Sequence, residues 1–64
     1  LKMLIEKKNI GWDGQYTWLI DGKETRLSEP EIIKLVGKAN EKKFFALWDY
    51  YGSFTFDTEK GIEI

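Results

Sequence analysis

The chain has 64 residues, the length of one small domain. Its 10 basic and 11 acidic side chains leave a net charge of −1, without the positive excess that is typical of proteins that bind duplex DNA. It contains no cysteine and no histidine, which excludes disulfides, thiolate chemistry and most zinc sites. We therefore expect one domain over residues 1–64, without metal or cofactor, in the cytoplasm. No stretch is apolar enough to span a membrane, so we expect no membrane partner.

Apolar and polar residues alternate from Leu1 to Lys8, which predicts a strand with one half-buried face. The next six residues, NIGWDG, contain two glycines, an asparagine and an aspartate and predict a turn or short loop. Trp12 in this loop has two interpretations. By default it folds back over the edge of the core. Alternatively it is presented to a partner, because tryptophan is enriched among the residues that dominate interfaces.

Asp21-Gly22 separates two alternating runs and predicts a two-residue type I′ hairpin, because both central residues of that turn need a positive φ. The register then places Leu19 opposite Glu24. Side chains alternate in direction along a strand, so five of them share the core face: Tyr16, Trp18, Ile20, Thr25 and Leu27. The other face of the hairpin is mostly polar, with Leu19 as its apolar exception.

Ser28 begins a predicted helix from Glu29 to about Asn40, and Glu31 stands where the acidic partner of a capping box belongs. Apolar residues at helical spacing form its expected buried stripe: Ile32, Leu35, Val36 and Ala39. Gly37 then falls inside the helix, where glycine costs about 1 kcal/mol relative to alanine.

Residues 43–50, KFFALWDY, are strong β formers, and we predict a strand there. A short loop at residues 50–52 leads to a return strand over residues 53–58. This pair of strands is expected to place five side chains on a core face: Phe44, Ala46, Trp48, Phe54 and Phe56. Ile62-Glu63-Ile64 forms either a last short strand or a loose tail.

The predicted order, β-β-β-α-β-β, indicates an α+β domain of two layers, an antiparallel sheet with one helix on one face. One helix cannot cover both faces of the sheet. Apolar residues among charges on the open face therefore predict a partner-binding or homodimer surface: Leu4, Leu19, Phe45 and Leu47. The alternative is scattered surface residues without a role. Secondary candidates lie in loops: Trp12, Tyr50 and Tyr51.

Catalysis is not expected. Nucleophilic catalysis needs an activating base beside serine, threonine or cysteine, and Ser28 already caps a helix. Three carboxylates near one predicted hairpin are candidates for an acid–base pair or a magnesium site, namely Asp49, Asp57 and Glu59. Exposed carboxylates near a turn are usually only solvated. The motifs of phosphate, dinucleotide and EF-hand calcium binding are absent from the sequence.

The sequence therefore favours a non-enzymatic protein-binding module that associates with itself or modifies another protein. The main alternative is single-stranded nucleic-acid binding, which combines aromatic platforms with basic side chains. Its candidates are Tyr16, Trp18, Trp48, Tyr50 and Tyr51 with Lys7, Lys8, Lys42 and Lys43, and the helical row Lys34, Lys38 and Lys42. Such a row is more often a solvated face. In composition alone, the chain is similar to small accessory proteins of phages and bacterial mobile elements.

Overall fold

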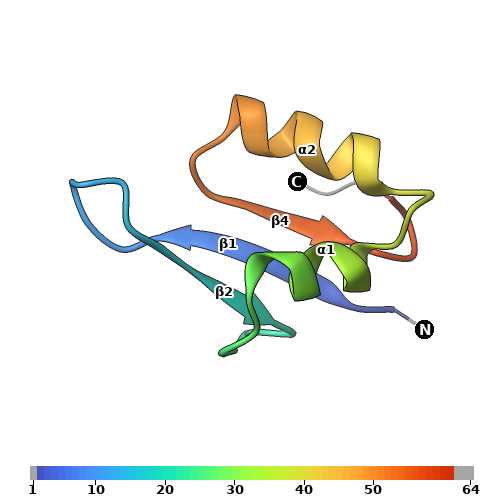
Figure 1. The fold of residues 1–64 in the computed structure, drawn as a ribbon, viewed down its shortest axis with the longest axis horizontal. Helices are drawn as coiled ribbons and strands as arrows, with labels where there is room; N and C mark the ends of the chain where they lie inside the picture. Colours follow the sequence, from blue (N-terminus) through green and yellow to red (C-terminus); the bar gives the residue numbers. More distant parts are fainter. Residues whose placement is uncertain (1, 62–64) are drawn as a thin grey trace.

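The computed structural model describes residues 2–61, which form four strands and two helices. The elements in chain order are β1 (Leu4–Asn9), β2 (Tyr16–Ile20), β3 (Lys23–Glu24), α1 (Glu29–Val36), α2 (Glu41–Tyr50) and β4 (Phe54–Asp57). Neighbouring strands are antiparallel, in the order β3-β2-β1-β4. Figure 1 shows that the chain leaves the hairpin through both helices and returns in β4 on the far side of β1. The predicted α+β class and antiparallel sheet are confirmed.

The predicted hairpin turn is present, with φ of 53° at Asp21 and 86° at Gly22. The register is the one expected, with Leu19 opposite Glu24. β3 is shorter than predicted, because the chain leaves the sheet soon after two paired residues. The predicted tail Ile62-Glu63-Ile64 lies outside the described residues.

α1 begins as predicted. The Glu31 carboxylate accepts hydrogen bonds from the backbone amide and the hydroxyl of Ser28, both at 2.9 Å. The helix ends at Val36 rather than near Asn40, because Gly37 has φ 88° and ψ 149°, a conformation nearly restricted to glycine. The predicted long helix is therefore wrong, and Gly37 is its end rather than an interior residue.

The buried side of α1 also differs in part from the expected stripe. Ile32 and Val36 are buried as expected. Ile33 packs against the core in place of Leu35, which is exposed. The expected fourth member, Ala39, follows the helix and is also exposed.

Residues 41–50 form α2, so the predicted strand over residues 43–50 is wrong. The backbone amide of Phe44 donates to the carbonyl of Asn40 at 2.9 Å, and that of Tyr51 donates to Leu47 at 2.9 Å. Several residues of this segment favour helices intrinsically, including Glu41, Lys42, Lys43, Ala46 and Leu47. The helix also places Phe44, Leu47 and Trp48 on one side, at spacings of three and four residues.

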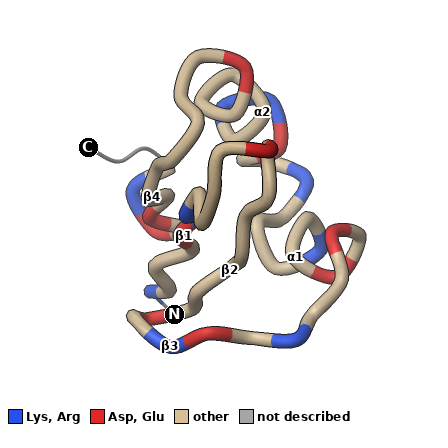
Figure 2. The backbone as a smooth tube through the Cα atoms, turned by 90° about the vertical axis from the view of Figure 1, so that its left-hand side faces the viewer, with Lys and Arg blue, Asp and Glu red and all other residues tan. Residues whose placement is uncertain are grey.

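Seven buried side chains from three strands and both helices form one core: Ile5, Trp18, Ile32, Val36, Phe44, Phe54 and Phe56. Phe44 lies at its centre, with its ring centroid 5.4 Å from that of Phe54 and 5.5 Å from that of Phe56. Trp48 packs at the margin of the core, whereas Ala46, expected inside it, is exposed. In Figure 2 both helices lie on the same side of the strands. No helix within residues 2–61 is long and apolar enough to cross a membrane.

Replacing Gly37 by alanine distinguishes the observed helix end from a continuous helix. No atom lies within 4 Å of the added Cβ, so backbone strain alone sets the effect. We expect Gly37→Ala to lower the free energy of unfolding by about 1–3 kcal/mol in urea titrations. Gly11→Ala is the control, since Gly11 has no positive φ. A gain of about 1 kcal/mol, as for glycine inside a helix, would contradict the observed end.

Candidate functional site

The sheet face opposite the core is mainly polar, and two leucines are its apolar members. Alternation along β1 and β2 places five side chains there: Leu4, Glu6, Lys8, Thr17 and Leu19. Phe45 and Leu47, expected to complete a patch on this face, lie on α2 instead. The predicted patch is therefore wrong. Isolated leucines on a polar face are ordinary surface residues.

On α2 the side chains of Phe45 and Leu47 point to different flanks, because residues two apart in a helix lie about 200° apart around its axis. Phe45 is half-exposed and stacks on Trp48, with ring centroids 6.1 Å apart. Leu47 packs against the core and lines a groove on the other flank. As partner-binding candidates the two residues now belong to separate surfaces.

The exposed large apolar side chains gather at one end of the molecule. Within residues 2–61 there are six, and four of them lie in the loop after β1 or at the end of α2: Ile10, Trp12, Tyr50 and Tyr51. We call these four the aromatic end. Figure 1 shows both segments on the left-hand side of the fold. Trp12 is fully exposed, so the default expectation that it folds back over the core is wrong.

Two hydrogen bonds tie β1 to the loop between α2 and β4. The backbone amide of Asn9 donates to Ser53 Oγ at 3.0 Å, across 44 positions of sequence. Lys7 Nζ donates to the carbonyl of Gly52 at 2.7 Å. Trp12 lies in the loop that begins just after Asn9, and Tyr50 and Tyr51 stand just before Gly52, so these bonds join the segments next to all three secondary candidates.

Lys7 is a buried lysine with 5% of its surface exposed. Its ammonium lies 4.3 Å from the Tyr16 ring centroid and 5.6 Å from that of Trp48. Cation–π contact and the bond to Gly52 replace the water that the charge has lost. The sequence suggested Lys7 only as a nucleic-acid contact. Its place on the same face as Ile5 was the signal that it points inward.

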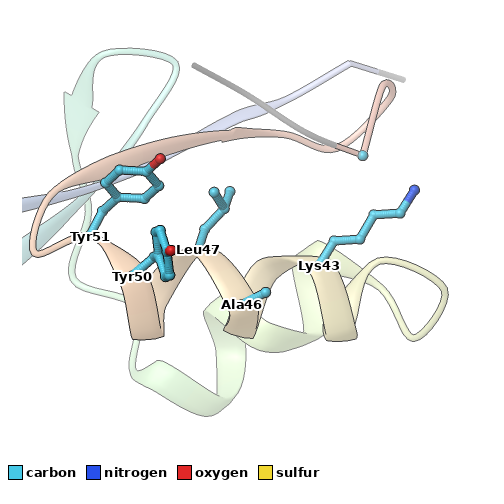
Figure 3. Close-up of a pocket in the computed structure, with 6 residues that line it drawn as sticks. Lys43, Ala46, Leu47, Tyr50 and Tyr51 are labelled. Atoms are coloured by element: carbon cyan, nitrogen blue, oxygen red, sulfur yellow. The ribbon is translucent and has the colours of Figure 1, made fainter.

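A groove of about 350 Å³ runs along α2 from the aromatic end (Figure 3). Six residues line it: Lys43, Ala46, Leu47, Tyr50, Tyr51 and Gly61. Tyr50 and Tyr51 stand at one end, with ring centroids 5.6 Å apart, and Lys43 extends at the other. The lining is therefore mostly apolar, with one cationic end.

The turn after β4 brings Gly61 to this groove. Asp57 Oδ1 accepts bonds from the backbone amides of Glu59 and Lys60 at 2.9 and 3.0 Å. The amide of Gly61, with φ 77°, donates to the Asp57 carbonyl at 2.8 Å. The hydrogen bond from the Lys60 amide, with a smaller effect from that of Glu59, holds the pKa of the Asp57 carboxyl below its usual value. Burial acts in the opposite direction and raises this pKa. Asp57, a candidate acid–base or magnesium residue in the sequence, thus accepts the hydrogen bonds of a turn.

The predicted lysine row is not on one helix. Gly37 ends α1 after Lys34, Lys38 lies in the following turn, and Lys42 belongs to α2. All three side chains are exposed. Figure 2 shows acidic residues interspersed with lysines along the helices, rather than the continuous basic stripe that a phosphate backbone favours.

Comparison with known proteins finds no family model, curated protein or solved structure that matches this chain. In the part of the chain that the structure describes, no three acidic side chains converge as a metal site requires. The site provides contact area, in the exposed rings of the aromatic end and in the apolar groove that starts from it.

The stabilisation that the Asp57 carboxylate gives to the turn after β4 should depend on pH. A folded-state pKa below the unfolded one means that the unfolded chain binds the proton more tightly. The stabilisation is therefore complete above the ordinary pKa of about 4 and is lost as the pH falls through the lower folded value. We expect Asp57→Asn to lower the urea midpoint at pH 7 and to flatten the loss of stability between about pH 5 and pH 2.

Glu59→Gln removes a neighbouring carboxylate for which the structure gives no such bonds, and it serves as the control. A pH dependence of Asp57→Asn equal to that of the unmodified chain would contradict the role of this carboxylate in the turn.

Lys7→Met tests whether the buried ammonium holds the loop between α2 and β4 against β1. Methionine keeps the apolar stem but leaves the Gly52 carbonyl without its charged donor, so we expect a loss of about 1–3 kcal/mol in urea unfolding. Faster amide hydrogen exchange at residues 51–53 should accompany it. Lys8→Met, at the exposed next position, should change stability by less than about 0.5 kcal/mol. Equal effects of the two substitutions would contradict the assignment.

Proposed function

We propose that this protein is a non-enzymatic protein-binding module that contacts its partner through the aromatic end. The observation that carries the proposal is the full exposure of Trp12. An indole in water contributes little to the stability of the fold. The same ring buried against a partner contributes as much as any side chain can, and tryptophan and tyrosine are enriched among the residues that dominate binding.

The loops that carry these rings are held in place before binding. Lys7 and Asn9 of β1 bond to residues 52 and 53 at 2.7 and 3.0 Å, which fixes the strand end from which the Trp12 loop leaves. Tyr50 and Tyr51 stand at the end of a helix that Phe44 anchors in the core. Ordering a contact surface in advance lowers the entropy lost on binding, which supports a role in recognition.

The charges beside the rings favour a protein over a nucleic acid. Asp13 follows Trp12 and Asp49 precedes Tyr50 in the sequence, so carboxylates accompany the exposed rings. Carboxylates repel the phosphates of a single strand, which require basic side chains next to stacking platforms. Lys7, a candidate for that role, is buried.

Self-association is one form of this proposal. Two aromatic ends that face each other would remove Trp12 of both copies from water, in the self-complementary contact of a symmetric dimer. The open sheet face, first expected to form a dimer, carries too few apolar residues to support this. Sedimentation over a wide concentration range distinguishes a dimer from a monomer that awaits a different protein.

Trp12→Ser should weaken partner binding by tenfold or more, because it removes the largest exposed apolar side chain of the aromatic end. The full-length chain serves as bait in a lysate, and captured proteins are compared between variants and then titrated. Self-association is followed by sedimentation.

Leu35→Ser is the matched control, since Leu35 is an exposed apolar residue on α1, outside the aromatic end. Circular dichroism should be unchanged in both variants. Equal binding by Trp12→Ser and the unmodified chain would overturn the proposal. Binding of single-stranded oligonucleotides at low salt that disappears with added salt would favour the nucleic-acid alternative instead.

A further inference from the structure

β4 forms one edge of the sheet, and within residues 2–61 no strand pairs with its outer side. The amide of Thr58 donates to the carbonyl of Met3 at 2.9 Å, and hydrogen-bonded pairs alternate along an antiparallel ladder. Phe56 and Phe54 therefore bond to β1. The backbone amide and carbonyl of Thr55, between them, point to the outer edge, where a further strand can pair with them.

The groove lies on the flank of α2 next to this edge. Phe45, on the other flank, stacks on Trp48, and Trp48 contacts the Trp18 ring of β2. Ala46 and Tyr50 therefore face away from β2 and towards the outer side of β4. Figures 1 and 3 show β4 running alongside α2.

We propose that the groove and the outer edge of β4 together bind an extended segment of a partner protein, which pairs with β4 as an added strand. The inference rests on the proposed protein-binding function and names what the site recognises. Addition of a strand to an exposed edge is a general mode of peptide recognition, in which the backbone gives affinity and side-chain pockets give specificity.

The charge of the groove specifies the segment. Lys43 is the one charged residue of the lining, and no acidic side chain of residues 2–61 forms an ion pair with it. Its ammonium lies beside Gly61, where an added Cβ would be 3.4 Å from Nζ. An acidic group at this end of the segment complements Lys43, and apolar side chains complement Leu47, Tyr50 and Tyr51.

The length of the groove limits the segment. Lys43 and Tyr50 are seven residues apart in a helix, or about 10 Å along its axis. An extended chain covers that distance in about three residues. The groove therefore fits a short motif in which one acidic residue and the apolar residues occupy every second position.

A pair of short peptides tests this inference on the full chain. The acidic probe is acetyl-Glu-Thr-Ile-Thr-Ile-amide, in which the glutamate and both isoleucines share one face of the extended chain, and the basic probe has lysine in place of glutamate. Amide shifts are followed by NMR. We expect the acidic probe to shift Thr55, Leu47 and Gly61, and to bind at least tenfold more tightly than the basic one. Lys43→Glu should reverse this preference, whereas Lys42→Glu, on the adjacent exposed residue, should leave it unchanged.

Three outcomes would overturn the inference. One is the absence of shifts at millimolar peptide, and another is equal affinity for both probes in the unmodified chain and in Lys43→Glu. The third is binding that is seen only in the double variant Ile62→Ser/Ile64→Ser, which would mean that the chain's own last residues take the place of a partner. Leu35→Ser, outside the groove and the aromatic end, should leave peptide binding unchanged. If neither peptide binds, but capture of a partner from the lysate still depends on Trp12, then the inference about the groove is overturned and the proposed function is not.

Discussion

Burial of the Phe44 ring joins α2 to the sheet. The ring is completely buried and lies 5.9 Å from the Trp18 ring of β2, 5.4 Å from Phe54 and 5.5 Å from Phe56 of β4. A chain of 64 residues buries little apolar surface, so large rings supply a disproportionate share of its stability. Because Phe44 contacts two strands that lie on opposite sides of β1, α2 packs on the sheet in one orientation.

That docking decides where the functional surfaces lie. With Phe44 pointing inward, Phe45 is on one flank of α2, and Ala46 and Tyr50 are on the other. The end of the helix then arrives beside β1, and Lys7 of β1 donates to the carbonyl of Gly52, which follows the helix. The burial of a lysine is costly unless its ammonium finds other partners, and here the Gly52 carbonyl and the Tyr16 and Trp48 rings supply them. The exposed rings and the groove are consequences of how the core packs.

The elements that could be predicted from the sequence depend on local chemistry. The Asp21-Gly22 turn needs two positive φ values, and the start of α1 needs Ser28 and Glu31; both signals lie within a few residues. The segment over residues 43–50 could not be assigned in the same way, because its aromatic residues suit a strand or a buried helix face equally. Two neighbouring signals were available: Gly37 as a helix end and Asn40 as the start of a new helix.

The candidate site was predictable only in its residue types. Trp12, Tyr50 and Tyr51 stood out as large rings in loops, but their common location follows from pairing across 44 positions, which no local pattern reveals. Phe45 and Leu47 share a face in a strand and oppose each other in a helix, so one wrong element misplaced both. The groove could not be foreseen, because it requires α2 to be a helix beside β4.

The conformation of residues 41–50 is therefore the point on which the fold, the aromatic end and the groove all depend. The most direct measurement is the set of Cα chemical shifts and nuclear Overhauser effects of this segment in the full-length chain. Helical Cα shifts from Glu41 to Tyr50, with contacts from the Phe44 ring to Phe54 and Phe56, are the expected result. Extended shifts, with cross-strand contacts between residues 43–50 and 53–58, would mean that a hairpin replaces α2 and that the groove does not exist.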